Sequence, residues 1–289
     1  EAERIQAALA VEKRDAFYQL VLFPTKASAL VNELYYYAGK NALYASQGRA
    51  ATNAMAKRVR ELFQADLDLM DYYNGEFAGG KWAHFMDQTH LGYVSWRDPE
   101  KNSLAAIELA EIELPAEAAM GLAPEGSTSG KEESLLAFDS LGRRKHYFEI
   151  FNKGRSPFEY EIIKQPDWIV LSETKGTIDD EKRIWVGVDW EKAPKGEGRG
   201  RIEILGAGTR SKIDVTTFDP RDVSRQSLVG FAEGEGLVSI EAEHYTKKKD
   251  AGTSRWTRLG DYGPTLSGMR AAVGVQGLVH LLLFLQQFL

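Results

Sequence analysis

Hydrophobic residues recur at a helical period near the start of the chain. From Arg4 to Tyr73 they lie every three or four positions, which is typical of amphipathic helices. Pro24 falls inside this region, and we expect it to end or kink its helix because proline has no amide hydrogen to donate. The pattern predicts a helical bundle. Its positions are Phe17, Leu20, Val21, Ala27, Leu30, Val31, Leu34, Met55, Val59, Leu62, Phe63, Leu69 and Met70.

The period changes to two in the middle of the chain. Residues 123–134 read APEGSTSGKEES, a polar stretch without periodicity that indicates a linker. Beyond it, apolar and polar residues alternate over 147–151, 158–162, 184–188, 202–204 and 213–215, as they do in strands. Turn signals at 152–154, 175–176 and 195–196 separate these runs. About seven short strands at this spacing predict an immunoglobulin-like antiparallel β-sandwich.

One short segment, Gly80 to Asn102, has the mixture of residues that chemistry or recognition needs. It reads GKWAHFMDQTHLGYVSWRDPEKN. Aromatic rings stack on the apolar faces of pyranose sugars, while imidazole, amide and carboxylate groups hydrogen-bond to sugar hydroxyls. The alternative interpretation is a loop that only fills the core, since buried Trp and Tyr are common. The candidate binding residues are Trp82, His84, Asp87, His90, Tyr93 and Trp96.

The same segment resembles the signature loop of glycoside hydrolase family 115, the xylan α-glucuronidases. The similarity extends upstream through RDAFYQLVLFPTKASALVNELYYYAGKNALYASQGR and downstream through FDSLGRRKHYFEIFNKGRSPFEYEI and WIVLSETKGTIDDEKRIWVGVDWEKAPKGEGRGRIEILGAG. The resemblance implies an inverting enzyme that releases 4-O-methylglucuronic acid linked α-1,2 to xylose. It also implies that the catalytic acid and base lie on a barrel before this chain, which would then be a C-terminal piece.

Within this resemblance the loop contributes to the wall of the substrate cleft. We expect three aromatic residues to be platforms or walls and two histidines to bind hydroxyl or carboxylate groups, with Asp87 orienting one imidazole. Arg97 is a candidate partner of the uronate, because a guanidinium binds carboxylate through two hydrogen bonds, but it lies outside the closest match. The aromatic residues are Trp82, Tyr93 and Trp96, and the histidines are His84 and His90.

The segment from Val238 begins VSIEAEHYTKK and resembles the first strand of carbohydrate-binding β-sandwich modules and of the family's last domain. In some such modules the carboxylates of this strand hold calcium, so Glu241 and Glu243 are weak candidates, the alternative being a solvated strand face. The predicted organisation is therefore multidomain α + β. It comprises a helical bundle with the aromatic and histidine loop (1–122), a linker (123–134), the sandwich (135–218) and an incomplete C-terminal β domain (229–289).

Composition excludes several classes of function. A net charge of −6 gives no electrostatic reason for binding nucleic acid or an anionic membrane. There is no cysteine, so disulfide frameworks and thiolate chemistry are excluded. The histidines and Asp87 of the loop could approach a metal ion, but the H-E-x-x-H pattern is missing and we expect no metal and no cofactor. Gly206-Ala207-Gly208 is expected to form a turn.

The ends of the chain bear on how complete it is. It starts at Glu1 without a signal peptide, which we interpret as truncation of a periplasmic or extracellular protein, the location that the resemblance implies. Leu278 to Leu289 is apolar but too short to span a bilayer, which takes about 20 residues. We interpret residues 271–289 as a segment outside the native reading frame, the alternative being a buried helix or strand.

The leading hypothesis is an accessory part of an α-glucuronidase that is inactive alone. Its expected partners are xylan or glucuronoxylan oligosaccharides and the catalytic domains of the same protein, and a homodimer is left open. The alternatives are a freestanding carbohydrate-binding protein and a structural spacer without a ligand.

Overall fold

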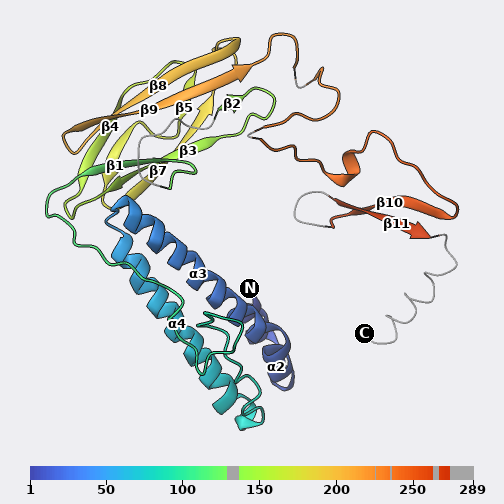
Figure 1. Cartoon of the computed structure of the whole chain (residues 1–289). Helices are drawn as coiled ribbons and strands as arrows, with labels where there is room; N and C mark the ends of the chain where they lie inside the picture. The colour runs from blue at the N-terminus through green and yellow to red at the C-terminus, as the bar shows by residue number, and fades with distance from the viewer. Residues whose placement is uncertain (129–136, 225, 235, 263–266, 274–289) are drawn as a thin grey trace. The chain divides into compact units, whose positions relative to one another are not determined.

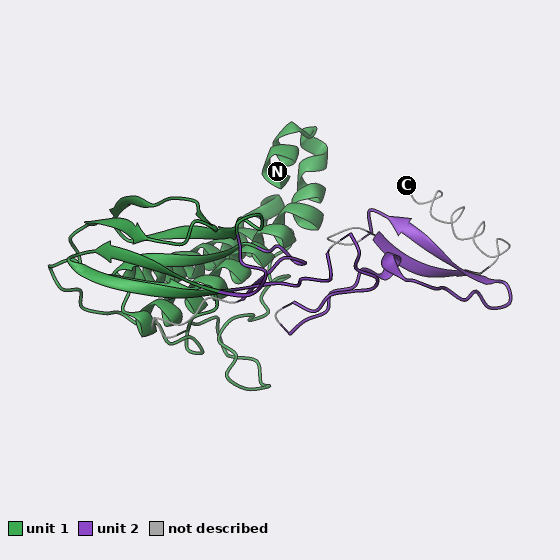
Figure 2. Cartoon of the chain, turned by 90° about the horizontal axis from the view of Figure 1, so that it is seen from above, with its two compact units in different colours: residues 1–136, 145–192, 199–216 green, residues 137–144, 193–198, 217–289 purple. Residues whose placement is uncertain are grey.

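The computed structural model describes residues 1–128, 137–224, 226–234, 236–262 and 267–273 (Figure 1). The chain divides into two compact units, which Figure 2 colours separately. Unit 1 comprises residues 1–136, 145–192 and 199–216, and unit 2 comprises residues 137–144, 193–198 and 217–289. A helical part is followed by β-sheets, so the predicted α + β fold class is confirmed.

The helical part is dominated by one long antiparallel hairpin, formed by α3 and α4 (Figure 1). Gly48 ends α3 with φ +68°, a left-handed conformation that glycine adopts without steric cost, and the chain then turns into α4. The helix changes from π-helical to α-helical geometry one residue before Pro24, which lies in the first turn of α3. The helices are α1 (Ala2–Ala8), α2 (Val11–Phe17), the π-helical Tyr18–Leu22, α3 (Phe23–Gln47), α4 (Thr52–Gly75) and the 3-10 segment Phe77–Gly80.

Two apolar clusters hold the hairpin together. The first lies at the far end of the hairpin and consists of Tyr18, Leu22, Phe23, Leu69, Tyr73 and Phe77. The second joins Leu34 of α3 to α4 and to Leu91 of the loop that follows; its buried members are Leu34, Val59, Leu62 and Leu91. The loop is thereby part of the hairpin's core on one side. Farther along, Asn41 accepts from the amide of Ala110 (2.8 Å) and donates to its carbonyl (2.9 Å), which holds the returning chain against α3.

The β-sandwich has the immunoglobulin-like strand order. One sheet runs β1-β3-β7-β5 and the other β2-β9-β8-β4-β6. The first order corresponds to A-B-E-D, and β9-β8-β4 corresponds to G-F-C. The short β2 pairs parallel with β9. The strands are β1 (Met120–Pro124), β2 (Phe138–Asp139), β3 (His146–Asn152), β4 (Phe158–Lys164), β5 (Ile169–Leu171), β6 (Lys175–Ile178), β7 (Glu181–Val188), β8 (Gly196–Gly206) and β9 (Thr209–Asp219).

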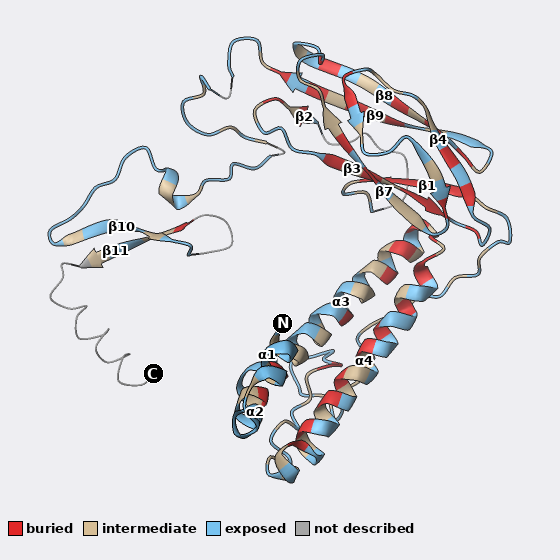
Figure 3. Cartoon of the chain, turned by 180° about the vertical axis from the view of Figure 1, so that it is seen from behind, coloured by how far each residue is buried: buried red, intermediate tan, exposed pale blue. Residues whose placement is uncertain are grey.

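Alternate residues of these strands are buried, as the red bands of Figure 3 show. Ile184 and Val186 of β7 and Ile202 and Ile204 of β8 are fully buried, so the predicted period of two is confirmed. The predicted turn at Lys175-Gly176 is wrong, because both residues belong to β6. Gly176 pairs with Tyr160 of β4, and a Cβ on Gly176 would lie 3.3 Å from the Tyr160 ring. The glycine at this position leaves space for the Tyr160 ring and does not form a turn.

Two other predicted turns and the linker can be located. Ala207 (φ +46°) and Gly208 (φ +70°) form the tight turn between β8 and β9, as expected. Asn152-Lys153-Gly154 leads out of β3. Strand β1 extends to Pro124, so the first two residues of the predicted linker pair with β3; residues 129–136 lie outside the described residues.

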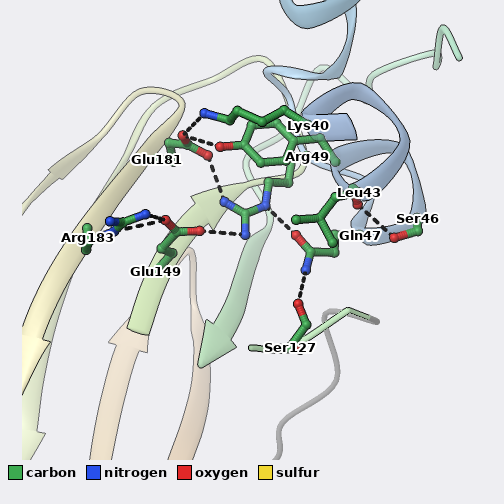
Figure 4. A network of polar contacts seen from close by, with 10 residues as sticks. Lys40, Leu43, Ser46, Gln47, Arg49, Ser127, Glu149, Glu181 and Arg183 are labelled. Carbon is green, nitrogen blue, oxygen red and sulfur yellow. Dashed lines mark hydrogen bonds and ion pairs between the residues drawn. The ribbon is translucent and has the colours of Figure 1, made fainter. Parts of the chain in front are cut away.

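A buried cation joins the hairpin to the sandwich inside unit 1 (Figure 4). Arg49, 1% exposed, bonds to Glu181 (2.7 Å), Glu149 (2.8 Å) and the Gln47 side chain (2.6 Å). Its guanidinium also lies over the rings of Tyr44 and Phe151. Two carboxylates balance its charge and an amide oxygen accepts a further hydrogen bond, so its burial is compensated.

Two pKa values report on this network. Burial alone would raise the pKa of Glu149, but the hydrogen bond from Arg183 and the charge of Arg49 hold it below its usual value. Burial, together with the hydrogen bond to Glu181, raises the pKa of the Tyr44 hydroxyl. The hydroxyl therefore stays protonated and donates to the carboxylate.

Unit 2 contains an antiparallel hairpin of β10 (Ser254–Gly260) and β11 (Ser267–Val273), preceded by a 3-10 turn at Ala242–His244. Glu243 accepts from Arg258 of β10 (2.5 Å) and from the hydroxyl of Ser267 in β11. Of the two carboxylates considered for calcium, Glu241 and Glu243, the latter is thus engaged by a guanidinium. Residues 271–273 belong to β11, and residues 274–289 of the predicted out-of-frame segment lie outside the described residues.

Candidate functional site

Loop 80–102 follows α4 after a sharp turn that contains two glycines. Ala78, Gly79 and Gly80 all have positive φ, so the chain reverses sharply after Phe77. Trp82 then packs against the apolar cluster at the end of the hairpin, with its ring centroid 5.4 Å from that of Phe85. Trp82 therefore anchors the loop, while Phe85 is 59% exposed.

His84 and Asp87 form a pair on the solvent side of the loop. The His84 Nδ1 lies 2.7 Å from Asp87 Oδ2, and the His84 side chain is 87% exposed. Asp87 thus lies within hydrogen-bond distance of an imidazole, and its role in a sugar site stays a prediction. His84 has φ +63°, an uncommon conformation for a residue with a side chain, although histidine adopts it more often than most. The local backbone thus turns the imidazole outward.

His90 is held by a partner that the sequence analysis did not identify. Its Nε2 lies 2.7 Å from Oδ2 of Asp66, a fully buried residue of α4. Its Nδ1 lies 3.3 Å from the carbonyl oxygen of Gln88. A signal was present, because Leu62, Asp66 and Leu69 share one apolar face of a helix, and a carboxylate on such a face needs a partner.

The distal part of the loop is a short turn with exposed aromatic residues. The Tyr93 hydroxyl donates to Asp98 (2.7 Å), which raises the pKa of Tyr93. Trp96 is 87% exposed, and the Arg97 guanidinium lies 5.4 Å from its ring centroid. Asn102 closes the loop by accepting the amides of His90 (2.8 Å) and Leu91 (3.0 Å). The turn is therefore ordered by side chains while its aromatic faces stay accessible.

A groove of about 460 Å³ lies between the loop and α3. Polar groups from Ser28, Asn32, Gln88 and His90 reach its otherwise apolar lining. It is completed by Phe23, Ala27, Val31, Met70, Phe85 and Met86.

The six predicted residues thus occupy four places rather than one. They are the groove (His90), the outward pair (His84 and Asp87), the distal turn (Tyr93 and Trp96) and the apolar cluster at the end of the hairpin (Trp82). Among the described residues, no three imidazole or carboxylate side chains lie close enough together to hold a metal ion. In the same residues, no helix combines the length and apolar character needed to cross a membrane.

Comparison with known families gives a match in the C-terminal part of the chain. Residues 230–276 match the family described as glycosyl hydrolase family 115 C-terminal domain. This match supports membership of the chain in glycosyl hydrolase family 115. The matched residues lie in unit 2, whereas the groove and loop 80–102 lie in unit 1. No curated protein sequence matches it.

Solved structures offer only distant similarity. The periplasmic chaperone SfaE is 10% identical, with a TM-score of 0.27 over 36% of this chain and 58% of the chaperone. The YadV chaperone is 10% identical, with a TM-score of 0.28 over 53% of this chain and 66% of the chaperone. WR4, a C. elegans MSP family member, is 11% identical, with a TM-score of 0.22 over 29% of this chain and 97% of WR4. The chain thus spans less than two thirds of either chaperone, and we draw no conclusion from scores this low.

Proposed function

We propose that this chain is the accessory part of an inverting xylan α-glucuronidase, and that loop 80–102 forms one wall of its substrate cleft. The observation that carries the proposal is the accessibility of the loop's polar and aromatic groups. The His84 side chain is 87% exposed, and Trp96 is 87% exposed as a whole residue. A groove of about 460 Å³ opens beside His90. A loop that only filled the core would bury these groups.

The chemistry of the loop suits a sugar that carries a carboxylate. Trp96 offers a flat face with the Arg97 cation beside it, and the pair could hold a pyranose ring and its uronate together. His84 and His90 are positioned by Asp87 and Asp66 and can hydrogen-bond to hydroxyls. The catalytic acid and base of an inverting hydrolase, about 6.5–9.5 Å apart, would come from the catalytic domain of the parent enzyme. Xylan as substrate and export from the cytoplasm belong to this proposal.

The test is activity of the parent enzyme on decorated xylan. Trp96→Ala and His84→Ala should each lower kcat/KM for release of glucuronic acid by about tenfold or more, because each removes a contact worth about 1.4 kcal/mol or more. Trp185→Ala on the sandwich, where Trp185 is 44% exposed, is the matched control and should leave kcat/KM unchanged. Unchanged activity in both loop variants would show that the loop is only architectural.

A freestanding carbohydrate-binding function is the second candidate, and the groove is the observation that favours it. The chain alone would then bind glucuronoxylan oligosaccharides in calorimetry with micromolar affinity. Absence of heat would leave the accessory function as the better explanation.

A further inference from the structure

A second cleft, of about 800 Å³, lies on the sandwich within unit 1 and far along the sequence from loop 80–102. Its volume is in the range of small-molecule sites, about 300–1,000 Å³. It is bordered by the segment after β4 and by β8 and β9; its lining residues are Lys164, Gln165, Pro166, Arg199, Gly200, Arg201, Glu203, Asp214, Val215 and Thr216.

The charges of this cleft do not balance. Arg201 pairs with Asp214 (2.7 Å), and Lys164 lies 3.6 Å from Glu203. Arg199 is exposed and forms no hydrogen bond or ion pair with any residue in the described part of the chain. One guanidinium is therefore left over in a protein whose net charge is −6. A guanidinium presents a planar fork of donors that matches a carboxylate.

Neutral polar groups lie beside this cation. The Gln165 amide nitrogen donates to the carbonyl of Ile169 (3.1 Å), which fixes the direction of the side chain. Its Oε1 then has no donor among the described residues although it is shielded from solvent. Thr216 contributes a hydroxyl and Pro166 an apolar surface to the same lining. This set can accept from and donate to the hydroxyls of a polyol.

We propose that the sandwich carries a binding site for a uronate sugar, with its carboxylate on Arg199 and its hydroxyls near Gln165 and Thr216. The choice of a sugar among hydroxylated carboxylates rests on the proposed function. The site itself depends only on the cleft and on the Arg199 guanidinium, which has no partner in the part of the chain that the structure describes. It would give the protein a second contact with an acidic polysaccharide, apart from loop 80–102.

The experiment is calorimetric titration of the whole chain with sodium D-glucuronate, D-glucose and inorganic phosphate. Glucuronate should bind with a dissociation constant in the millimolar range, and glucose should bind at least tenfold more weakly because it lacks the carboxylate. Arg199→Ala should weaken glucuronate binding by about tenfold or more, and Arg199→Lys by less, since lysine keeps the charge without the fork. Arg155→Ala, an exposed arginine outside the cleft lining, is the matched control and should bind like the parent.

Each other outcome would overturn the proposal. Equal binding of glucose would exclude recognition of the carboxylate, and phosphate binding as tight as glucuronate would reduce the site to a general anion site. Absence of glucuronate binding, or binding that survives Arg199→Ala in a folded chain, would remove the site. Arg199→Ala should weaken glucuronate binding by the same factor in a Trp96→Ala background, so the failure of this site and of the loop's proposed role can be distinguished.

Discussion

Loop 80–102 and the Arg49 network show two opposite uses of polar residues within one unit. Arg49 is buried and bonded to two carboxylates and an amide, and it connects helix to sheet. The loop presents His84 and Trp96 to solvent and buries only what anchors it. A buried, fully matched cation is typical of architecture, whereas ordered but exposed imidazole and indole groups are available to a ligand.

The largest effect should come from the buried cation. Arg49→Ala leaves Glu149 and Glu181 without their shared guanidinium, and we expect a loss of about 3–5 kcal/mol in the free energy of unfolding. Urea denaturation followed by circular dichroism measures this loss. The control is Arg60→Ala, which breaks an exposed pair with Glu111 and should cost about 1 kcal/mol or less. Equal losses in the two variants would refute the structural role given to Arg49.

The next effect compares two histidine–aspartate pairs of the same chemistry. Asp66→Ala leaves His90 without the buried acceptor of α4, and we expect a loss of about 2 kcal/mol. Asp87→Ala removes the exposed partner of His84 and should cost about 0.5 kcal/mol or less. Urea midpoints measure both changes. A larger loss in Asp87→Ala would mean that the exposed pair holds the loop in place.

The Arg49 network also predicts a dependence on pH. Since the pKa of Glu149 is lowered in the folded protein, its contribution is fully present above the unfolded value of about 4.3 and is lost as the pH falls through the folded pKa. The urea midpoint should therefore drop as the pH falls below about 4.3. Glu149→Gln should make this drop shallower. An unchanged slope would show that other carboxylates dominate the acid transition.

The smallest effect on stability is expected in the distal turn. Trp96 is 87% exposed, so Trp96→Ala should change the free energy of unfolding by about 0.5 kcal/mol or less. A thermal melt of the variant measures this change. Intact stability together with lost activity in the parent enzyme would separate a binding role from an architectural one. If Trp96→Ala lost as much free energy of unfolding as Asp66→Ala, the indole would have a structural role instead.

Much of the fold could be predicted because local periodicity reflects burial. Ile184 and Val186, or Ile202 and Ile204, alternate with polar residues and are buried as their spacing predicts. The turn at 175–176 was mispredicted because Lys-Gly favours turns locally, while the need for space beside the Tyr160 ring is a contact between strands. The predicted domain boundaries stay a prediction. The predicted assignment of residues to the sugar site likewise stays a prediction.

The order of helices and strands, the family resemblance and the segment with candidate chemistry could all be inferred from the sequence, since all three follow from residues close together in the chain. Packing was needed to show that Asp66 faces His90, that Arg49 meets Glu149 and Glu181, and that Arg199 has no partner among the described residues. These pairings join residues from separate elements, and a charge finds or lacks its partner only once those elements have packed. The periodicity of a sequence does not show which side chains from distant parts of the chain will come into contact.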